Sequence, residues 1–196
     1  MPKLILASAS RYKKQQLQQL GLSFETMNPD IDETPLAGES ALAQSLRLAK
    51  AKAKKIASKN PHSYVLGCDQ SASIEGHILC KPGSPEKAKQ QLQQSSGKEL
   101  SFFSGIALCN LQHDIEFVAS CETVVRFRQL NEEEIDNYIK KEPATDCVGA
   151  FKVEAMGIQL FDYVRSDDPS ALVGLPLIKT AQLLRQAGIN PLDTHD

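Results

Sequence analysis

Histidine is scarce in this sequence, and the few that occur are not grouped. The four histidines lie far apart along the chain, at His62, His77, His113 and His195. A histidine-based metal site needs several such ligands at a short spacing, and a serine nucleophile of the triad type needs a histidine as its base. The sequence therefore supports neither kind of site.

Cysteine pairs, long apolar runs and an excess of positive charge are also missing. The cysteines include no C-x-x-C pair and number five, which favours reduced thiols in the cytoplasm over a disulfide or zinc framework. No apolar run approaches the roughly 18 residues of a membrane span, and the apolar part of MPKLILASAS is too short for a signal peptide. The formal net charge of −2 argues against nucleic-acid binding. We therefore expect a cytoplasmic protein that binds neither membranes nor nucleic acids.

Three familiar glycine-containing motifs are absent. The sequence has no G-x-G-x-x-G, no G-x-S-x-G and no G-x-x-x-x-G-K-[ST], since its nearest match, SSGKEL, lacks the earlier glycine and the hydroxyl. What is present is the composition of an ordinary globular protein, with 41% hydrophobic and 23% charged residues in 196. This length predicts a single domain over residues 1–196.

Strand-like and helix-like segments alternate in a mixed order. Leu4–Ala7 is a short apolar strand, and FFSGIALCN and FVASCETVVRFR should pair as a hairpin across the turn LQHD. Caps, prolines, glycines and helical periodicity predict further helices over 38–60, from 85 to near 97, over 131–143 and over 176–184, the last closed by Gly188. This order predicts an α/β or α+β fold with an incompletely parallel sheet.

The first helix has an unusual charge pattern. Ser10 is a good N-cap for a helix that runs towards Gly21, which puts Arg11, Lys13 and Lys14 in its first turn. Cations are unfavourable there because the helix dipole already makes that end positive, whereas the helix after Asn131 begins with three glutamates. Either the cations are solvated and screened, or an anion such as phosphate occupies the helix end.

Two carboxylates are candidates for chemistry. Asp69 follows the apolar strand SYVLGC, where α/β sheets expose site residues, although it could equally serve as a turn or cap residue. Glu33 lies in NPDIDET, just before the longest expected helix. Hard carboxylate ligands without histidine partners favour Mg²⁺ or Mn²⁺.

Two lysines accompany these carboxylates. Lys52 lies at the border of an apolar helical stripe formed by Leu42, Leu46, Ala49, Ala53 and Ile56. Its stem could pack while its ammonium reaches a cleft, or the side chain could be solvated. Lys81 lies in the loop CKPGSPE, as a ligand or as an exposed turn lysine. Carboxylates with several lysines indicate phosphoryl chemistry, and the residues alone lead no further.

The ordered set of motifs resembles the Maf family of nucleoside triphosphate pyrophosphatases over essentially the whole chain. The matching segments are Ser8-Ala9-Ser10, Asp32-Glu33, Lys52, Gly67-Cys68-Asp69, Lys81-Pro82, Ser96-Gly97 and Val173-Gly174-Leu175-Pro176. The resemblance implies a Maf/ITPase-like α/β/α layered fold with a mixed sheet, a cleft between two lobes and a homodimer.

Within the family the sequence is most similar to the YceF branch, whose members hydrolyse 7-methyl-GTP. That likeness implies that Tyr12, Gln70 and Glu154 determine substrate specificity. The sequence departs from the family pattern where Arg11 replaces a proline and Lys13-Lys14 replaces an arginine pair. Lysine meets phosphate as a point charge, whereas arginine can bind it as a bidentate fork.

The resemblance also implies a mechanism and a distribution of roles. Asp69 would be the general base, Glu33 and Asp69 would hold Mg²⁺ or Mn²⁺, and the phosphates would be bound by Ser10, Lys13, Lys14, Lys52 and Lys81. Water would attack the α-phosphorus to give a nucleoside monophosphate and pyrophosphate, which clears modified nucleotides and links the family to cell-division arrest. Two alternatives stay open: the same reaction on dTTP, UTP or another purine nucleotide, and a non-catalytic nucleotide-binding regulator of septum formation.

Overall fold

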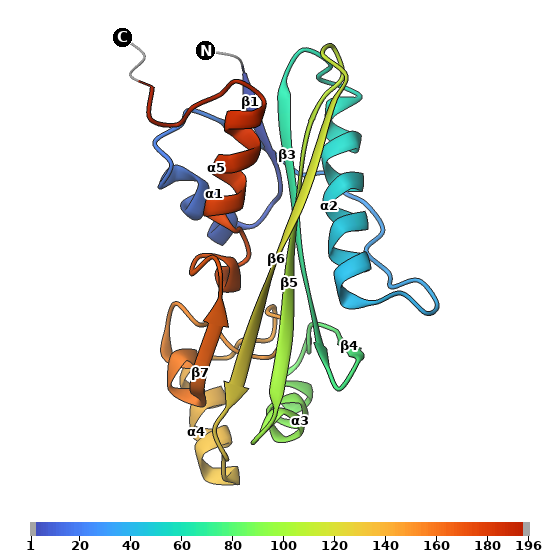
Figure 1. Ribbon diagram of the computed structural model, residues 1–196. Helices are drawn as coiled ribbons and strands as arrows, with labels where there is room; N and C mark the ends of the chain where they lie inside the picture. Colours follow the sequence, from blue (N-terminus) through green and yellow to red (C-terminus); the bar gives the residue numbers. More distant parts are fainter. Residues whose placement is uncertain (1–2, 194–196) are drawn as a thin grey trace.

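A mixed seven-stranded sheet organises the computed structural model, which describes residues 3–193 (Figure 1). The strands are β1 (Leu4–Ala7), β2 (Glu25–Met27), β3 (Tyr64–Ile74), β4 (His77–Leu79), β5 (Glu99–Asn110), β6 (Ile115–Phe127) and β7 (Phe161–Ser166). Their order is β2-β1-β3-β5-β6-β7, with β4 paired to β3. Only the pairs β1–β2 and β1–β3 are parallel, so the expected incompletely parallel sheet and the β5–β6 hairpin are confirmed.

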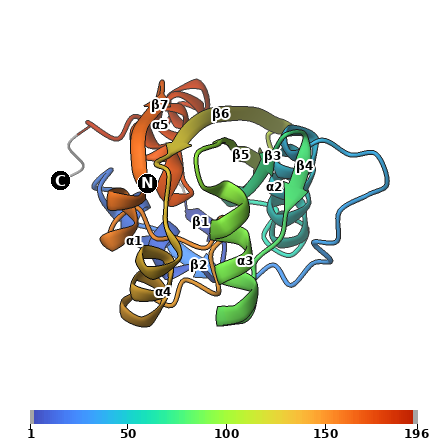
Figure 2. The same ribbon diagram turned by 90° about the horizontal axis from the view of Figure 1, so that it is seen from below.

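Five α-helices surround this sheet. They are α1 (Arg11–Gln18), α2 (Ala41–Ala57), α3 (Pro85–Ser95), α4 (Glu132–Lys141) and α5 (Leu177–Gln186), with short 3-10 helices at Met156–Leu160 and Ala171–Val173. Helix α2 covers one face of the sheet, and α1 and α5 pack together on the other (Figures 1 and 2). The expected helices are therefore confirmed, and together with the sheet they form the α/β/α layers that the resemblance implies. No helix in residues 3–193 is long and apolar enough to cross a membrane.

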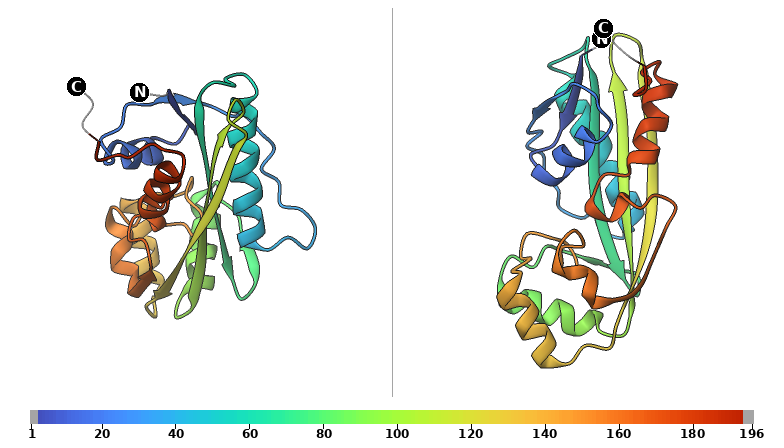
Figure 3. Two further views of the ribbon diagram at one scale, coloured as in Figure 1. Left: turned by 45° about the horizontal axis from the view of Figure 1, so that its top comes forward. Right: turned by 90° about the vertical axis from the view of Figure 1, so that its left-hand side faces the viewer.

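The hydrophobic core is divided between two lobes that share the long strands β3, β5 and β6 (Figure 3). One lobe holds the core under α2 and the core under α1 and α5. The other lobe packs α3 and α4 on the far halves of the same strands, around an aromatic cluster in which Phe102 and Phe151 meet edge to face at 5.4 Å. The three long strands therefore run from one lobe to the other and span the gap between the lobes.

Helix α2 lies unusually close to the sheet because two strand positions are glycine. A Cβ atom on Gly67 of β3 would lie 2.1 Å from the carbonyl oxygen of Ala49, and one on Gly105 of β5 would lie 2.6 Å from that of Ser45. Such distances are far inside van der Waals contact, so only glycine fits. Small residues on α2 complete the close contact.

This close contact corrects the apolar stripe expected on α2. Leu42 is 38% exposed and Leu46 is only partly buried, while the buried face runs through Ser45, Ala49 and Ala53. Leucine side chains would not fit where the helix backbone approaches the two strand glycines. The buried face is therefore rotated from the expected one, and Lys52 lies within it rather than at its border.

Candidate active site

A cavity of about 720 Å³ lies between the two lobes. It collects nine of the ten residues that the sequence assigns to a site, namely Ser10, Tyr12, Lys13, Glu33, Lys52, Asp69, Gln70, Lys81 and Glu154. The tenth, Lys14, is exposed and is not among the lining residues. Each residue of a helix is turned by about 100° from the one before, so α1 directs Lys14 away when Lys13 faces the cavity.

Asp69 lies in the middle of β3, which corrects the expectation that the strand ends there. The strand continues through five more residues to Ile74, and Asp69 pairs with Gly105 of β5. Polar residues stay in the strand because β5 supplies backbone partners along its whole length. Side chains two apart share one face of a strand, so Asp69 and Ser71 lie together, and the Ser71 hydroxyl donates to Asp69 Oδ2 at 3.3 Å.

A buried lysine joins the two candidate carboxylates. Lys52 Nζ lies 2.7 Å from Asp69 Oδ1 and 2.6 Å from Glu33 Oε1. The side chains of Lys52 and Asp69 are each 9% exposed, whereas that of Glu33 is 49% exposed. Burial lowers the pKa of Lys52, but the charges and hydrogen bonds of Asp69 and Glu33 outweigh burial, so the pKa is raised. Lys52 is thus a fixed cation that orients Asp69.

A second lysine approaches β3 from the helix layer on the opposite face. Lys13 Nζ donates to the carbonyl oxygen of Cys68 at 3.2 Å, next to Asp69 in the chain. Its aliphatic stem lies against Gly174, where a Cβ atom would come within 3.2 Å of Lys13 Cε. Ser10 caps α1 by accepting from the Lys13 backbone N–H at 3.5 Å. The N-terminal end of α1, whose first turn has no acidic residue, therefore faces the cavity.

Another part of the cavity lining is aromatic and acidic. The guanidinium of Arg11 lies 4.8 Å from the centre of the Tyr12 ring and donates to its hydroxyl at 2.8 Å. The hydrogen bond to Tyr12, with added contributions from the negative charges of Asp146 and Glu154, raises the pKa of Arg11. A cation thus already lies against an aromatic ring and near two carboxylates.

The side-chain amide of Gln70 has three acceptors within hydrogen-bond distance of its two N–H bonds. Its Nε2 donates to Ser104 Oγ at 3.2 Å and to the carbonyl oxygens of Ala171 and Leu172, both at 3.1 Å. These bonds fix the amide plane and use its donor group. The acceptor Oε1 remains as the atom through which Gln70 can recognise a ligand in the cavity.

Comparison with known proteins identifies the fold family. A family model described as Maf-like protein matches residues 3–187. This chain belongs to the Maf family. A curated relative from Xanthomonas oryzae, named 7-methyl-GTP pyrophosphatase, is 45% identical over 97% of this chain and 99% of its own length. Another of that name, from Bordetella pertussis, is 43% identical over 99% of this chain and 96% of its own length. Among solved structures, the Ham1 protein of Staphylococcus aureus matches 65% of this chain and 72% of its own at 14% identity, with a TM-score of 0.48.

The cavity of this Maf protein includes residues that the sequence did not single out. Asp146 comes from the loop after α4, and Phe102, Phe151 and Leu172 supply apolar surface. In the sequence the apolar residues look like ordinary core positions, and no local pattern marks Asp146. Asp146 becomes recognisable as a cavity residue only in the folded protein, where its loop lies near the start of α1.

Cys68 adjoins the base candidate of this Maf protein but is not exposed to the cavity. Its side chain is fully buried, and burial raises the pKa of the thiol, so it stays protonated at neutral pH. We expect Cys68→Ala to keep kcat/KM close to the wild-type value and to lower the free energy of unfolding by about 1 kcal/mol through the lost packing. Steady-state kinetics and thermal unfolding measure both. A loss of kcat comparable with that of Asp69→Asn would show that the thiol takes part in the reaction.

Proposed function

We propose that this Maf protein hydrolyses 7-methyl-GTP to 7-methyl-GMP and pyrophosphate. The observation that carries the proposal is one cavity with two sets of groups in its lining: three lysines, one of them paired with a buried carboxylate, and an aromatic ring together with two further carboxylates. The names of the curated relatives support the same substrate.

The lysine set suits a triphosphate. Lys13, Lys52 and Lys81 line the cavity from three separate segments, so they can surround a chain of phosphates. The N-terminal end of α1 adds backbone N–H groups and the positive end of the helix dipole. Two of the three cations in the first turn of α1, Arg11 and Lys13, line the cavity, so an anion bound there would offset their unfavourable position at the helix end.

The aromatic and acidic set suits a cationic base. Methylation at N7 gives guanine a delocalised positive charge, whereas the bases of GTP, dTTP and UTP are neutral. The planar cation of Arg11 already lies against the Tyr12 ring, and the negative charges of Asp146 and Glu154 help to raise its pKa. A 7-methylguanine ring can make the same kinds of contact by cation–π attraction and charge-assisted hydrogen bonds. Gln70 Oε1 can accept from an N–H on the guanine edge.

The proposed reaction is a single displacement at the α-phosphorus. Asp69 accepts a proton from water, and the water oxygen bonds to the α-phosphorus as the bond to the bridging oxygen of the β-phosphate breaks. Lys52 keeps Asp69 oriented, and Lys13 and Lys81 balance the charge that develops on the phosphate oxygens. Pyrophosphate leaves and the nucleoside monophosphate remains.

The carboxylates of Glu33 and Asp69, which Lys52 Nζ bridges, are the groups that would hold a divalent ion. Residues 3–193 contain no group of three or more histidine, cysteine or acidic side chains able to cage a metal by themselves. Mg²⁺ commonly keeps several waters and is bound by one or two carboxylates together with substrate phosphates. Mg²⁺ or Mn²⁺ held in this way would supply additional positive charge to the phosphate oxygens.

Base selectivity should depend on Glu154 and Tyr12. We expect Glu154→Gln to lower the ratio of kcat/KM for 7-methyl-GTP over GTP by about 10–100-fold, because it removes a negative charge that favours the cation. Tyr12→Ala should lower the same ratio by about 2–30-fold through the lost ring face. Both ratios come from steady-state kinetics on the two nucleotides.

The matched control is Glu133→Gln on α4. It also removes an exposed carboxylate, but Glu133 lies outside the cavity lining, so this variant should keep the wild-type ratio of kcat/KM for the two nucleotides. Equal losses on both nucleotides in Glu154→Gln and Tyr12→Ala would remove the assignment of these residues to specificity. A wild-type enzyme that prefers GTP, dTTP or UTP would contradict the proposed substrate itself.

The remaining proposals concern the protein as a whole. We propose that the chain acts as one domain, as a homodimer and in the cytoplasm. The five cysteines, all in residues 3–193, are free, as is usual for proteins of a reducing compartment. Sedimentation equilibrium of the purified protein tests the dimer. A measured mass near the 21.5 kDa of a single chain would contradict it.

A further inference from the structure

Glu33 reaches the cavity from a long segment without helix or strand. Residues 28–40 form this segment, which joins β2 to α2 and bulges away from the body of the protein (Figure 1). Glu33 nevertheless lies 2.6 Å from Lys52. An irregular segment has no ladder of backbone bonds to fix such a side chain, so other contacts must hold it.

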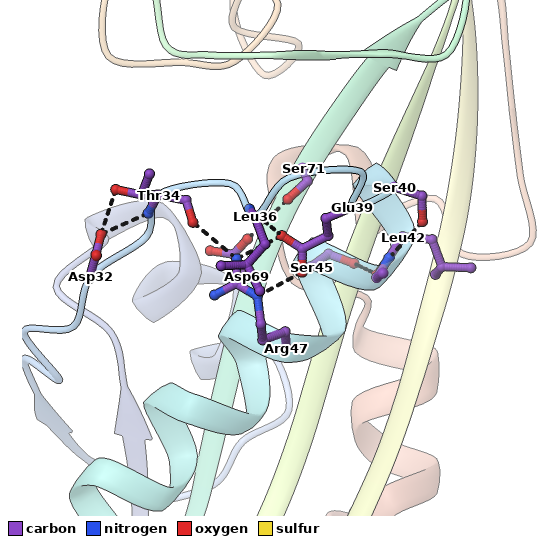
Figure 4. Close-up of polar contacts among 11 residues, drawn as sticks. Asp32, Thr34, Leu36, Glu39, Ser40, Leu42, Ser45, Arg47, Asp69 and Ser71 are labelled. Atoms are coloured by element: carbon purple, nitrogen blue, oxygen red, sulfur yellow. Dashed lines mark hydrogen bonds and ion pairs between the residues drawn. The ribbon is translucent and has the colours of Figure 1, made fainter.

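Arg47 of α2 supplies those contacts. Its Nε lies 2.7 Å from Glu39 Oε1, and one terminal nitrogen lies 2.8 Å from Glu39 Oε2, which makes a bidentate pair. The same nitrogen donates to the carbonyl oxygen of Thr34 at 3.2 Å. One side chain thus ties two points of the segment to the helix that carries Lys52, as Figure 4 shows.

Bonds within the segment connect these anchors to Glu33. Asp32 Oδ1 accepts from the backbone N–H of Thr34 at 2.9 Å and from its hydroxyl at 2.6 Å. Glu33 lies between these two residues in the chain. At the far end, Glu39 Oε2 also accepts from the Leu36 N–H at 3.1 Å. Because Arg47 holds Thr34 and Glu39, and Thr34 is bonded to Asp32, the backbone at Glu33 is held in place as well.

We infer that Arg47 is a positioning residue, which holds Glu33 beside Lys52 and Asp69 by clamping Glu39 and the Thr34 carbonyl. The inference rests on the proposed function, since it gives Glu33 a role in the reaction. The side chain of Glu39 is 7% exposed and that of Arg47 is 31% exposed, so the pair is partly shielded from water. Lysine could not replace the fork, because an ammonium makes no planar bidentate pair with a carboxylate.

Hydrogen exchange tests the clamp in the enzyme alone, without nucleotide or metal. Arg47→Met should speed amide exchange across residues 28–40 by about tenfold, because the segment loses both anchors. Arg128→Met is the matched control: Arg128 also bonds one glutamate, Glu134 at 3.0 Å, and one backbone carbonyl, that of Gln159 at 2.8 Å, outside the cavity lining. Unchanged exchange of residues 28–40 in Arg47→Met would overturn the inference.

A double-mutant cycle tests whether Arg47 acts through Glu33. We expect Arg47→Met to lower kcat/KM for 7-methyl-GTP about tenfold in the wild-type background, and less than about twofold in Glu33→Ala. If the two substitutions lower kcat/KM independently, so that their fold-losses multiply in the double mutant, Arg47 acts by another route and the inference is overturned. A normal kcat/KM in Glu33→Ala would instead remove Glu33 from the proposed reaction. If Glu33→Ala lowers kcat/KM and the effect of Arg47→Met is equally large in that background, the inference fails but the proposed function stands.

Two further variants separate clamping from simple charge, because Arg47 also lies near enough to Asp69 to feel its charge. Glu39→Ala keeps the cation and removes the fork's acceptor, and it should reproduce most of the Arg47→Met loss. Arg47→Lys keeps the charge and should restore only part of kcat/KM. Full activity in both variants would show that only the charge matters. Since Glu39→Ala leaves Arg47 in place, it also keeps the test usable if Arg47→Met fails to fold.

Discussion

Asp69→Asn should lower kcat by about 10²–10⁴-fold, the loss typical of a missing general base. The amide cannot take a proton from water at neutral pH. The fold should survive, because the amide oxygen can still accept from Lys52 Nζ, which lies 2.7 Å from the carboxylate in the wild type. Steady-state kinetics on 7-methyl-GTP and thermal unfolding measure the two effects. The selectivity for 7-methyl-GTP over GTP should stay nearly unchanged, because both rates fall together.

The matched control is Asp162→Asn, an exposed aspartate on the edge strand β7. It should keep wild-type kcat and stability. An Asp69→Asn protein that unfolds would support the other reading of the sequence, in which Asp69 holds the strand together. A folded variant with normal kcat would exclude Asp69 as the base.

Lys52→Met should damage both stability and activity. Methionine keeps most of the stem but leaves the buried carboxylate of Asp69 without its cation. Breaking one side of a buried ion pair costs about 3 kcal/mol at the lower end of its range, and the half-exposed Glu33 favours that lower end. For a chain of this size the melting temperature should fall by about 6–12 °C. We expect kcat to fall by about 10²–10³-fold, since a fixed charge beside the reacting group is lost.

The pH dependence of the lost stability gives a second check. The pKa of Lys52 is raised in the folded protein, so its contribution is fully present below the ordinary lysine value of about 10.5 and is lost as the pH rises through the folded pKa. The stability difference from Lys52→Met should therefore stay level through neutral pH and shrink only in strong base. Lys55→Met, an exposed position on the same helix, should change neither property. An equal loss in that control would point to helix propensity instead of the ion pair.

Local signals predicted the elements of the fold well. The asparagine cap with an acidic first turn fixed the start of α4, and the structure shows the full capping box between Asn131 and Glu134. The two strand-like runs around LQHD form the β5–β6 hairpin. Such signals act over a few residues and do not depend on the rest of the chain.

Positions that depend on tertiary contacts were not predictable in the same way. The buried face of α2 is set by Gly67 and Gly105 on two strands that are distant in sequence. Helical periodicity alone therefore predicted Ala49, Ala53 and Ile56 correctly but wrongly included Leu42 and Leu46. Polar residues after Asp69 looked like the end of a strand, but pairing with β5 extends it to Ile74. The partner that decides the outcome belongs to another segment both for the rotated face of α2 and for the second half of β3.

The candidate site shows the same division. Its charged residues stood out one by one as lysines and carboxylates at unusual positions, and the ordered motifs joined them into a resemblance. The Lys52 bridge between Asp69 and Glu33, the role of Arg47 and the presence of Asp146 became visible only in three dimensions. Side chains from separate segments meet there, and no spacing in the sequence records such a meeting.

Hydrolysis of 7-methyl-GTP in ¹⁸O-labelled water is the most direct test of the central claim, that water attacks the α-phosphorus. Mass spectrometry and ³¹P NMR would identify the products and locate the label, with Asp69→Asn as the inactive control. We predict pyrophosphate without label and 7-methyl-GMP with one ¹⁸O on its phosphate. Orthophosphate and 7-methyl-GDP as first products, or the label in pyrophosphate, would contradict the account.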